Sequence, residues 1–267
     1  MRVQRGRGGR RASGRPRIRR LALAGALTSA MLLAGCSAPA TGTSGFGAAG
    51  VAPGGPWTID SGAGAPQPGA RQEIVTIGDS IMSGNGLDAE QAWPDVLARA
   101  NSWQVTNLAE DGAGFVQPGD DGHTFAEQVT QAIADAPDDP DAPALIVVSA
   151  SSNDLGRDPG KVEHAATKAF TALHRAFPGT ALVGLGAIWG DQEPPPELAE
   201  INDAVHSAAE AEGASWVDVG EPLAGRFDLM QFDDTHPTAA GQRVLATAVD
   251  ERLRALLGSA GSADSAG

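Results

Sequence analysis

The chain has 267 residues, 42% of them hydrophobic, and a formal net charge of −14. This length and composition suffice for a domain with a sizeable core. The acidic balance argues against partners such as nucleic acid or anionic lipid surfaces, because like charges repel. Residues 1–20 hold nine arginines and no acid, so the chain after residue 35 has 10 basic and 33 acidic residues, a net charge of −23.

The first 36 residues have the pattern of an export signal. An apolar run of thirteen residues, Leu21–Leu33, follows the arginines. It is too short to span a bilayer but fits the apolar region of a signal peptide. The run ends in Leu-Ala-Gly-Cys, which resembles the bacterial lipoprotein signal, and Cys36 is the only cysteine. This resemblance predicts an exported protein of the cell envelope, anchored to the membrane only through lipidated Cys36. A secreted protein with an ordinary signal peptide is the alternative.

Residues 37–70 consist mainly of Gly, Ala, Pro, Ser and Thr. Such a segment buries too little apolar surface to offset the entropy lost on ordering, which predicts a flexible tether. Residues 259–267 have a similar composition and are expected to form a disordered tail. The folded domain is therefore predicted to span residues 71–258.

Short apolar runs alternate with amphipathic segments along this domain. Strands are expected at Glu73–Ile77, Trp103–Leu108, Ala144–Ser149, Ala181–Leu185 and Ser215–Val219. Helices are expected at Ala92–Ala100, Thr124–Ala136, Val162–Phe177, Pro196–Glu212 and Thr238–Leu257. The alternation predicts an α/β fold, a three-layer α/β/α sandwich around a mainly parallel five-stranded sheet. Ligands bind beyond the carboxyl ends of the strands in such sheets, so polar residues that follow strands are candidates for a site.

Ser80 follows the first expected strand, and His236 precedes the last expected helix with Asp233 three residues before it. A serine hydrolase needs a hydroxyl to attack, an imidazole to take its proton and an acid to orient the imidazole. Asp234 is the competing acid, and the spacing favours Asp233. The other histidines have neither H-x-H nor H-E-x-x-H spacing, so no metal or other cofactor is expected.

Four sequence blocks, in this order, resemble the SGNH (GDSL-type) hydrolases, which are named for a Ser, a Gly, an Asn and a His. The blocks are Ile77–Ser80, Asn107–Gly112, Ser151–Asp154 and Asp233–His236. Two residues depart from the family pattern, because Ala109 and Ser151 stand where it usually has glycine. The resemblance extends over nearly all of residues 73–257.

The resemblance implies a role for each matching residue. Ser80 would be the nucleophile, His236 the general base and then acid, and Asp233 its orienting partner. The oxyanion hole would consist of the backbone N–H groups of Ser80 and Gly112 and the side-chain amide of Asn153. The expected activity is hydrolysis of carboxylic esters through an acyl-serine intermediate. The sequence does not identify the natural substrate, and short acyl esters, including O-acetyl groups on glycans, suit a tethered enzyme with an open site.

The α/β-hydrolase fold fits this sequence less well. Its G-x-S-x-G motif requires a glycine where Met82 stands, and here acid and histidine share one loop. Two further residues are candidates to line a substrate site: Trp189, which otherwise packs in the core, and His123 in a polar loop. An acyltransferase and a non-catalytic binding or structural lipoprotein on a hydrolase fold are the alternative functions.

Overall fold

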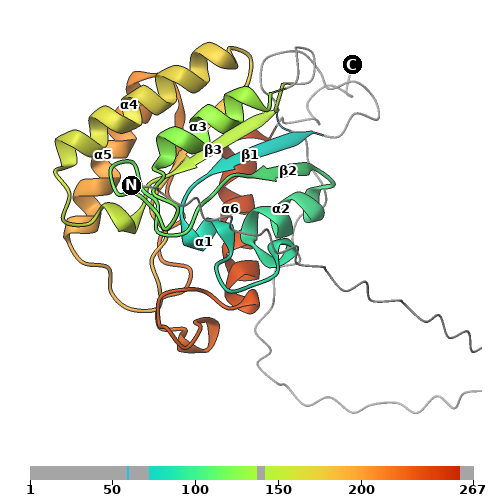
Figure 1. Cartoon of the computed structure of the whole chain (residues 1–267). Helices are drawn as coiled ribbons and strands as arrows, with labels where there is room; N and C mark the ends of the chain where they lie inside the picture. The colour runs from blue at the N-terminus through green and yellow to red at the C-terminus, as the bar shows by residue number, and fades with distance from the viewer. Residues whose placement is uncertain (1–58, 60–71, 137–141, 259–267) are drawn as a thin grey trace, which may run out of the picture. The chain divides into compact units, whose positions relative to one another are not determined.

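The computed structural model describes Ile59, residues 72–136 and residues 142–258 (Figure 1). The predicted signal peptide with Cys36, the predicted tether apart from Ile59, and the predicted tail lie outside the described residues. Within the described part of the chain, no helix is both long and apolar enough to cross a membrane.

The centre of the fold is one parallel sheet, which confirms the predicted fold class. Its strands, in spatial order, are β2 (Gln104–Asn107), β1 (Glu73–Ile77), β3 (Leu145–Ser149), β4 (Ala181–Leu185) and β5 (Ser215–Val217). All five residues of β3 are buried, as expected for a strand covered on both faces. Val75 in β1 lies opposite Thr106 on one side and Ile146 on the other.

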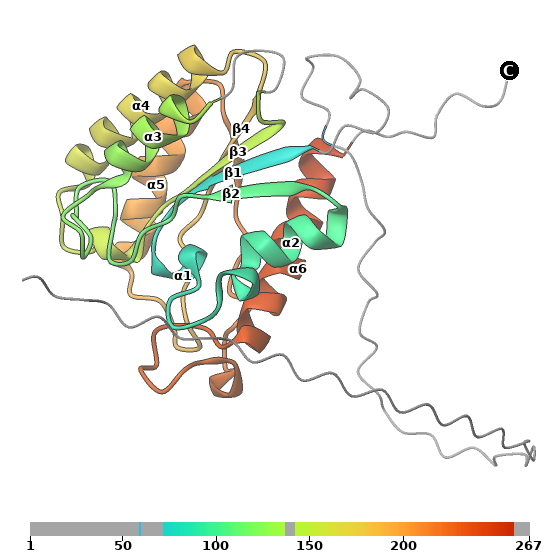
Figure 2. The same ribbon diagram turned by 45° about the vertical axis from the view of Figure 1, so that its right-hand side comes forward.

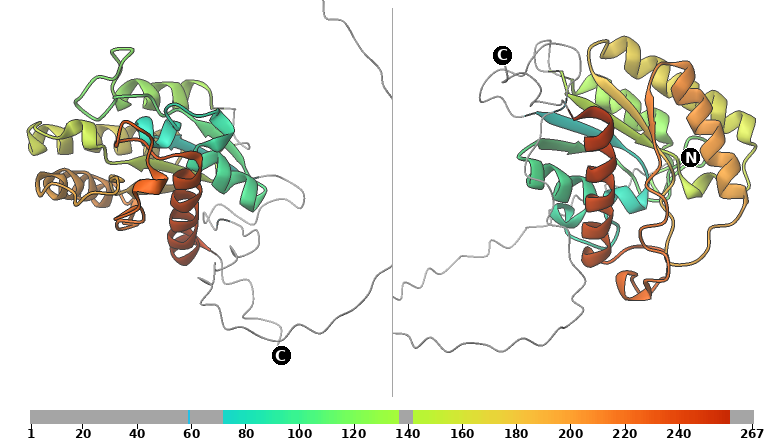
Figure 3. Two further views of the ribbon diagram at one scale, coloured as in Figure 1. Left: turned by 90° about the horizontal axis from the view of Figure 1, so that it is seen from below. Right: turned by 180° about the vertical axis from the view of Figure 1, so that it is seen from behind.

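Helices cover both faces of the sheet. They are α1 (Ser80–Ser83), α2 (Trp93–Asn101), α3 (Phe125–Ala134), α4 (Pro159–Ala176), α5 (Glu197–Ala211) and α6 (Ala239–Leu257), with short 3-10 segments η1 (Ala89–Gln91), η2 (Ser152–Asp154) and η3 (Phe227–Leu229). Figures 2 and 3 show α3, α4 and α5 on one face and α2 and α6 on the other. The result is the predicted three-layer sandwich.

Alternating strand residues divide the apolar core between the two faces. Val75 and Ile77 join the cluster under α3, α4 and α5, whereas Ile74 joins the cluster under α2 and α6. Phe170 and Trp93, both 0% exposed, are large side chains of these two clusters respectively. Burying a large apolar side chain fully contributes roughly 1.5–3 kcal/mol each, so this alternation fixes which side of each strand faces which helices.

Several element boundaries differ from the sequence-based expectation by one to three residues, and two of these differences have a clear local reason. Helix α4 begins at Pro159 rather than Val162, because the Asp158 side chain accepts hydrogen bonds from the Gly160 and Lys161 N–H groups and caps the helix there. Strand β5 ends at Val217 rather than Val219, because the Asp218 side chain accepts the Gly220 N–H at 2.7 Å and closes a turn.

Ile59 also departs from expectation, because it lies within the predicted tether but is only 1% exposed. The Gln72 side chain donates to the Ile59 carbonyl at 3.0 Å and accepts the Ile59 N–H at 2.8 Å. Ile59 also forms an antiparallel bridge with Gly258 at the end of α6. One large apolar side chain with both backbone groups paired is therefore part of the domain.

Candidate active site

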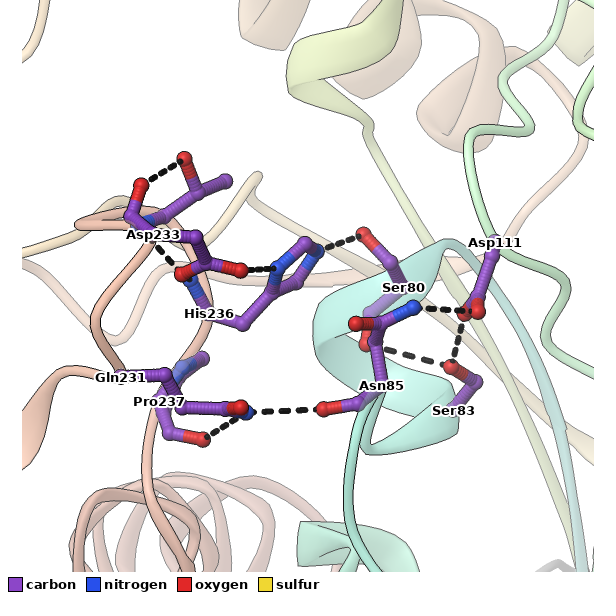
Figure 4. A network of polar contacts seen from close by, with 9 residues as sticks. Ser80, Ser83, Asn85, Asp111, Gln231, Asp233, His236 and Pro237 are labelled. Carbon is purple, nitrogen blue, oxygen red and sulfur yellow. Dashed lines mark hydrogen bonds and ion pairs between the residues drawn. The ribbon is translucent and has the colours of Figure 1, made fainter.

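The edge of the sheet at the carboxyl ends of the strands brings Ser80, His236 and Asp233 together. Ser80 is the first residue of α1, directly after β1, and its Oγ lies 2.9 Å from His236 Nε2. His236 Nδ1 lies 2.6 Å from Asp233 Oδ2. Figure 4 shows Ser80 and Asp233 on opposite sides of the His236 ring. This chain of contacts can pass a proton from the hydroxyl to the imidazole while the carboxylate stabilises the charge that forms.

The Asp233 carboxylate is held in its ionised form. Its hydrogen bond to the His236 side chain, followed by bonds from the backbone N–H groups of His236 and Thr235, lowers the Asp233 pKa from 3.8 to about 2. An ionised carboxylate at Nδ1 keeps the proton of a neutral imidazole on that nitrogen and leaves Nε2 free to accept the serine proton. Asp234, the competing acid, is exposed and has a left-handed backbone with φ 54°, and the contact to His236 comes from Asp233 instead.

Gln231 holds the loop that carries His236, and sequence reasoning missed it. Its Nε2 donates to the carbonyl of Asn85 at 2.8 Å and to that of Pro237 at 3.0 Å (Figure 4). Its backbone N–H donates to the His236 carbonyl at 2.8 Å. Gln231 therefore ties the histidine loop to the segment just after α1. No periodic pattern in the loop indicated this contact.

Amide side chains from three other elements hold the short turn that presents Ser80. Gln128 of α3 accepts the Gly78 N–H at 3.0 Å and donates to the Gly78 carbonyl at 2.9 Å. Asn107 donates to the Met82 carbonyl, and Gln242 of α6 donates to the Ile81 carbonyl, both at 2.9 Å. Gln128 and Gln242 are each 1% exposed, so both lie on the buried faces of their helices. The sequence signal for them was a polar residue on an otherwise apolar helix face.

Gly78 itself has no room for a side chain. An added Cβ would lie 2.5 Å from the Met82 sulfur and 2.9 Å from the Ser149 hydroxyl oxygen. Glycine at this position therefore lets the end of β1 approach α1 and β3 closely, which sets the position of Ser80.

The three expected oxyanion donors come from three segments at the same edge. Among the described residues, the backbone N–H groups of Ser80 and Gly112 have no hydrogen-bond acceptor, as is usual at the first turn of a helix for Ser80. Asn153 Nδ2 donates one of its two hydrogens to the Ala113 carbonyl at 2.9 Å, which leaves the other available. Asp154 fixes the loop after Gly112 by accepting the N–H groups of Phe115, Val116 and Gln117.

Residues 76–244 match the model of the GDSL-like lipase/acylhydrolase family. The chain belongs to this family. It is 32% identical to the GDSL lipase Rv0518 of Mycobacterium tuberculosis over 189 residues, which are 65% of this chain and 78% of the lipase. It is 29% identical to the esterase TesA of Pseudomonas aeruginosa over 198 residues, 72% of this chain and 92% of TesA.

A solved structure shares the fold at low sequence identity. Est24, a carbohydrate acetylesterase from Sinorhizobium meliloti, superposes with a TM-score of 0.54 at 14% identity, over 70% of this chain and 100% of that chain. Together with the family match, these comparisons confirm the SGNH-type resemblance and identify this protein as a serine hydrolase that acts on ester bonds.

A polar cavity of about 410 Å³ lies beside the α1 turn of the hydrolase. Its lining residues come from two segments and the acidic loop that follows them: Ser83–Leu87, Ala109–Asp111, Asp120 and Asp121. Asp111 accepts hydrogen bonds from Ser83 Oγ at 2.6 Å and from the Asn85 side chain (Figure 4). Four of the lining residues are acidic, which makes this cavity unfavourable for an anionic ligand.

The structure places the two candidate substrate-lining residues differently. Trp189 follows β4 and is partly buried against the core under α3, α4 and α5. His123 is exposed, and its Nδ1 lies 3.3 Å from Glu110, which lines the cavity. His123 therefore lies next to the cavity wall, whereas Trp189 has the contacts of a core residue. Contact of either residue with substrate stays a prediction.

No group of three or more His, Cys, Asp or Glu side chains in the described part of the chain is arranged to hold a metal ion.

Proposed function

We propose that this hydrolase cleaves short acyl esters of polar alcohols, with O-acetylated glycans as the substrate class, and that Ser80, His236 and Asp233 are its catalytic triad. The observation that carries the proposal is the continuous chain from Ser80 Oγ through the His236 ring to the Asp233 carboxylate, at 2.9 and 2.6 Å. This is the arrangement that activates a serine hydroxyl without any other group.

In the first half of the reaction, Ser80 Oγ attacks the ester carbonyl carbon as His236 Nε2 takes the hydroxyl proton. The carbonyl oxygen gains the negative charge and is stabilised by the N–H groups of Ser80, Gly112 and Asn153, each worth about 10²–10³-fold in kcat in comparable sites. The C–O bond of the alcohol then breaks, and protonated His236 gives its proton to the leaving alcohol oxygen.

In the second half, water replaces the alcohol. His236 Nε2 takes a proton from a water molecule as the water oxygen attacks the acyl-serine carbonyl carbon. The bond to Ser80 Oγ breaks, the proton returns to that oxygen, and the carboxylic acid leaves. An alcohol in place of water would give acyl transfer through the same intermediate, and the position of His236 serves both reactions.

The cavity beside α1 supports a polar alcohol as the leaving group. Its walls offer carboxylates and an amide, which accept and donate hydrogen bonds to sugar hydroxyls, and its charge disfavours phosphate-bearing lipids. The fold shared with the carbohydrate acetylesterase Est24 supports the same substrate class. A lipase is the second candidate, because the relative Rv0518 is a GDSL lipase.

The triad is tested with p-nitrophenyl acetate and the full chain. We expect Ser80→Ala and His236→Ala to lower kcat by about 10⁴- to 10⁶-fold, as in other serine hydrolases. His174→Ala is the matched control, because His174 is exposed in α4, and it should leave kcat unchanged. Equal activity of wild type and Ser80→Ala would refute the serine mechanism.

Substrate class is tested separately with p-nitrophenyl esters from acetate to palmitate and with acetylated oligosaccharides. We expect kcat/KM to fall as the acyl chain lengthens beyond butyrate, and free acetate to appear from the oligosaccharides. A kcat/KM that rises towards palmitate, without acetate release, would favour the lipase.

We also propose that the protein is exported and anchored to the cell envelope by lipidation of Cys36. The arginine-rich start, the apolar run Leu21–Leu33 and the following Ala-Gly-Cys support this proposal. Cys36→Ala should move the protein from the membrane fraction to the soluble fraction of fractionated cells. Unchanged membrane retention would count against lipidation.

A further inference from the structure

Ser151 is a buried hydroxyl at a position where the SGNH pattern usually has glycine. It lies between β3 and η2 and is 0% exposed. Its Oγ lies 2.7 Å from Asp79 Oδ2, 3.0 Å from the Ala113 carbonyl oxygen and 3.1 Å from the Asn153 backbone nitrogen. One side chain therefore touches the serine turn, the residue after Gly112 and the residue with the candidate oxyanion amide.

We propose that Ser151 is a positioning residue for the oxyanion hole, and that its hydroxyl holds Asn153 and Ala113 in place relative to the Ser80 turn. The proposal rests on the acyl-serine mechanism given above, but on no particular natural substrate.

The contacts form a closed ring around Asn153. The Asn153 backbone N–H donates to Ser151 Oγ, and the Asn153 side chain donates to the Ala113 carbonyl at 2.9 Å. That same carbonyl lies within hydrogen-bond distance of Ser151 Oγ. Asn153 is thus held at its backbone by Ser151 and at its side chain by the Ala113 carbonyl, which Ser151 Oγ also contacts. Fixing an oxyanion donor before the reaction avoids reorganisation when the charge forms.

Asp79 extends the ring to the nucleophile. Its Oδ1 accepts the Ile81 N–H at 3.0 Å and caps α1, while its Oδ2 faces Ser151. Burial raises the pKa of Asp79, which favours a protonated carboxyl. A protonated Asp79 donates to Ser151 Oγ, and Ser151 then donates its single proton to the Ala113 carbonyl. An ionised Asp79 takes that proton instead, and Ser151 then joins the serine turn to the Asn153 N–H but no longer donates to the Ala113 carbonyl.

The first test compares two substitutions on p-nitrophenyl acetate. Ser151→Ala keeps Cβ, which blocks a water, and removes the hydroxyl. We expect kcat to fall about 10- to 100-fold with KM nearly unchanged, less than the roughly 10²–10³-fold for a lost oxyanion donor. Ser151→Gly opens space for about one water with three polar partners, which suffices to hold it. We therefore expect Ser151→Gly to retain more activity than Ser151→Ala.

A role in packing alone predicts the opposite order, because alanine keeps more of the serine side chain than glycine does. Higher activity of Ser151→Ala than of Ser151→Gly, or a loss expressed in KM alone, would overturn the proposal. Ser152→Ala is the control, since Ser152 is the next residue and is partly exposed, and it should behave as wild type.

The second test is a double-mutant cycle with Asn153→Ala. A residue that acts through Asn153 loses most of its effect once the amide is gone. We expect Ser151→Ala to lower kcat less in the Asn153→Ala background than in wild type, and fully multiplicative losses would refute the coupling. If Ser151→Ala does not fold, Ser151→Gly completes the same cycle. An inactive wild type would refute the proposed mechanism itself, whereas wild-type kcat in both Ser151 variants would refute only this inference.

Discussion

The two halves of the candidate triad are held in opposite ways. The serine turn, residues 78–83, is bonded to side chains from α3, from α6 and from the end of β2. The histidine loop, residues 231–238, is held largely by contacts within itself. Its links to the rest of the domain run from Gln231 to Asn85, from His236 to Ser80 and from Thr238 to Leu229. The four residues from Phe232 to Thr235 are exposed. The candidate nucleophile is thus held by the core, and the candidate base by an exposed loop.

Their carboxylates differ in the same way. Asp79 of the serine turn is buried, and burial raises its pKa. Asp233 of the histidine loop has a 47% exposed side chain, and hydrogen bonds lower its pKa to about 2. The same chemical group is therefore favoured as an acid on one side of the site and as an anion on the other. Desolvation outweighs the hydrogen bonds of buried Asp79, whereas exposed Asp233 is stabilised as an anion by its hydrogen bonds to His236 and Thr235.

Of the substitutions that compare the two sides, one in the histidine loop is expected to have the largest effect. Asp233→Asn should lower kcat by about 10³- to 10⁴-fold, because an amide does not hold the imidazole in the required tautomer and does not stabilise its positive charge. Asp234→Asn is the matched control and should leave kcat within about twofold of wild type, like other surface substitutions that touch no partner. Steady-state kinetics on p-nitrophenyl acetate decides, and a greater loss in Asp234→Asn would reverse the assignment.

Removing a side chain that holds the serine turn should lower the free energy of unfolding. Gln128→Ala leaves the buried Gly78 N–H without a partner, which costs about 1–3 kcal/mol, whereas the Gly78 carbonyl still accepts the Glu110 N–H at 3.1 Å. We expect the free energy of unfolding in urea to fall by about 1–3 kcal/mol, on that same basis. Gln131→Ala, at an exposed position of the same helix, should change it by less than about 0.5 kcal/mol. Equal stability of the two variants would show that the turn does not depend on Gln128.

The smallest effect sharpens the contrast between the carboxylates. Because the pKa of Asp79 is raised on folding, the folded state binds this proton more tightly than the unfolded state. The wild type therefore loses stability as pH rises above the unfolded pKa of about 3.8 towards the folded pKa. Asp79→Asn, which resembles the protonated acid, does not.

The Tm of Asp79→Asn minus that of wild type should accordingly grow between pH 4 and pH 8. Thermal unfolding across that range measures it, and groups common to both proteins cancel in the difference. A difference that shrinks with pH would show that Asp79 is held as a stabilised anion.

The sheet, the helices on its faces and the family were predictable from the sequence. Apolar runs such as Leu145–Ser149, separated by amphipathic segments, leave few topologies for a parallel sheet. The order of the Ser80, Gly112, Asn153 and His236 blocks added the site candidates. The apolar runs are local patterns, and the blocks are recognised by their order along the chain. Both kinds of pattern can be seen in one sequence.

The supporting contacts were not predictable in the same way. Gln128 pairs with Gly78 across 50 positions of the chain, and its partner depends on the distance between a helix and a turn rather than on either segment alone. Ile59 was assigned to the tether because the prediction used the average composition of residues 37–70. An average does not single out one apolar side chain that packs in the core. Residues such as Gln128 and Ile59, whose partners are distant in the sequence, leave no periodic sequence pattern from which the contact could be predicted.

The bridge between Ile59 and Gly258 has a consequence for how this enzyme is handled. It pairs the chain's entry to the domain with the end of its last helix, next to Gln72, where β1 begins. Ser80 follows the opposite end of that strand. A fusion partner or a solid support joined at either terminus of the domain would therefore attach at the end of β1 opposite Ser80.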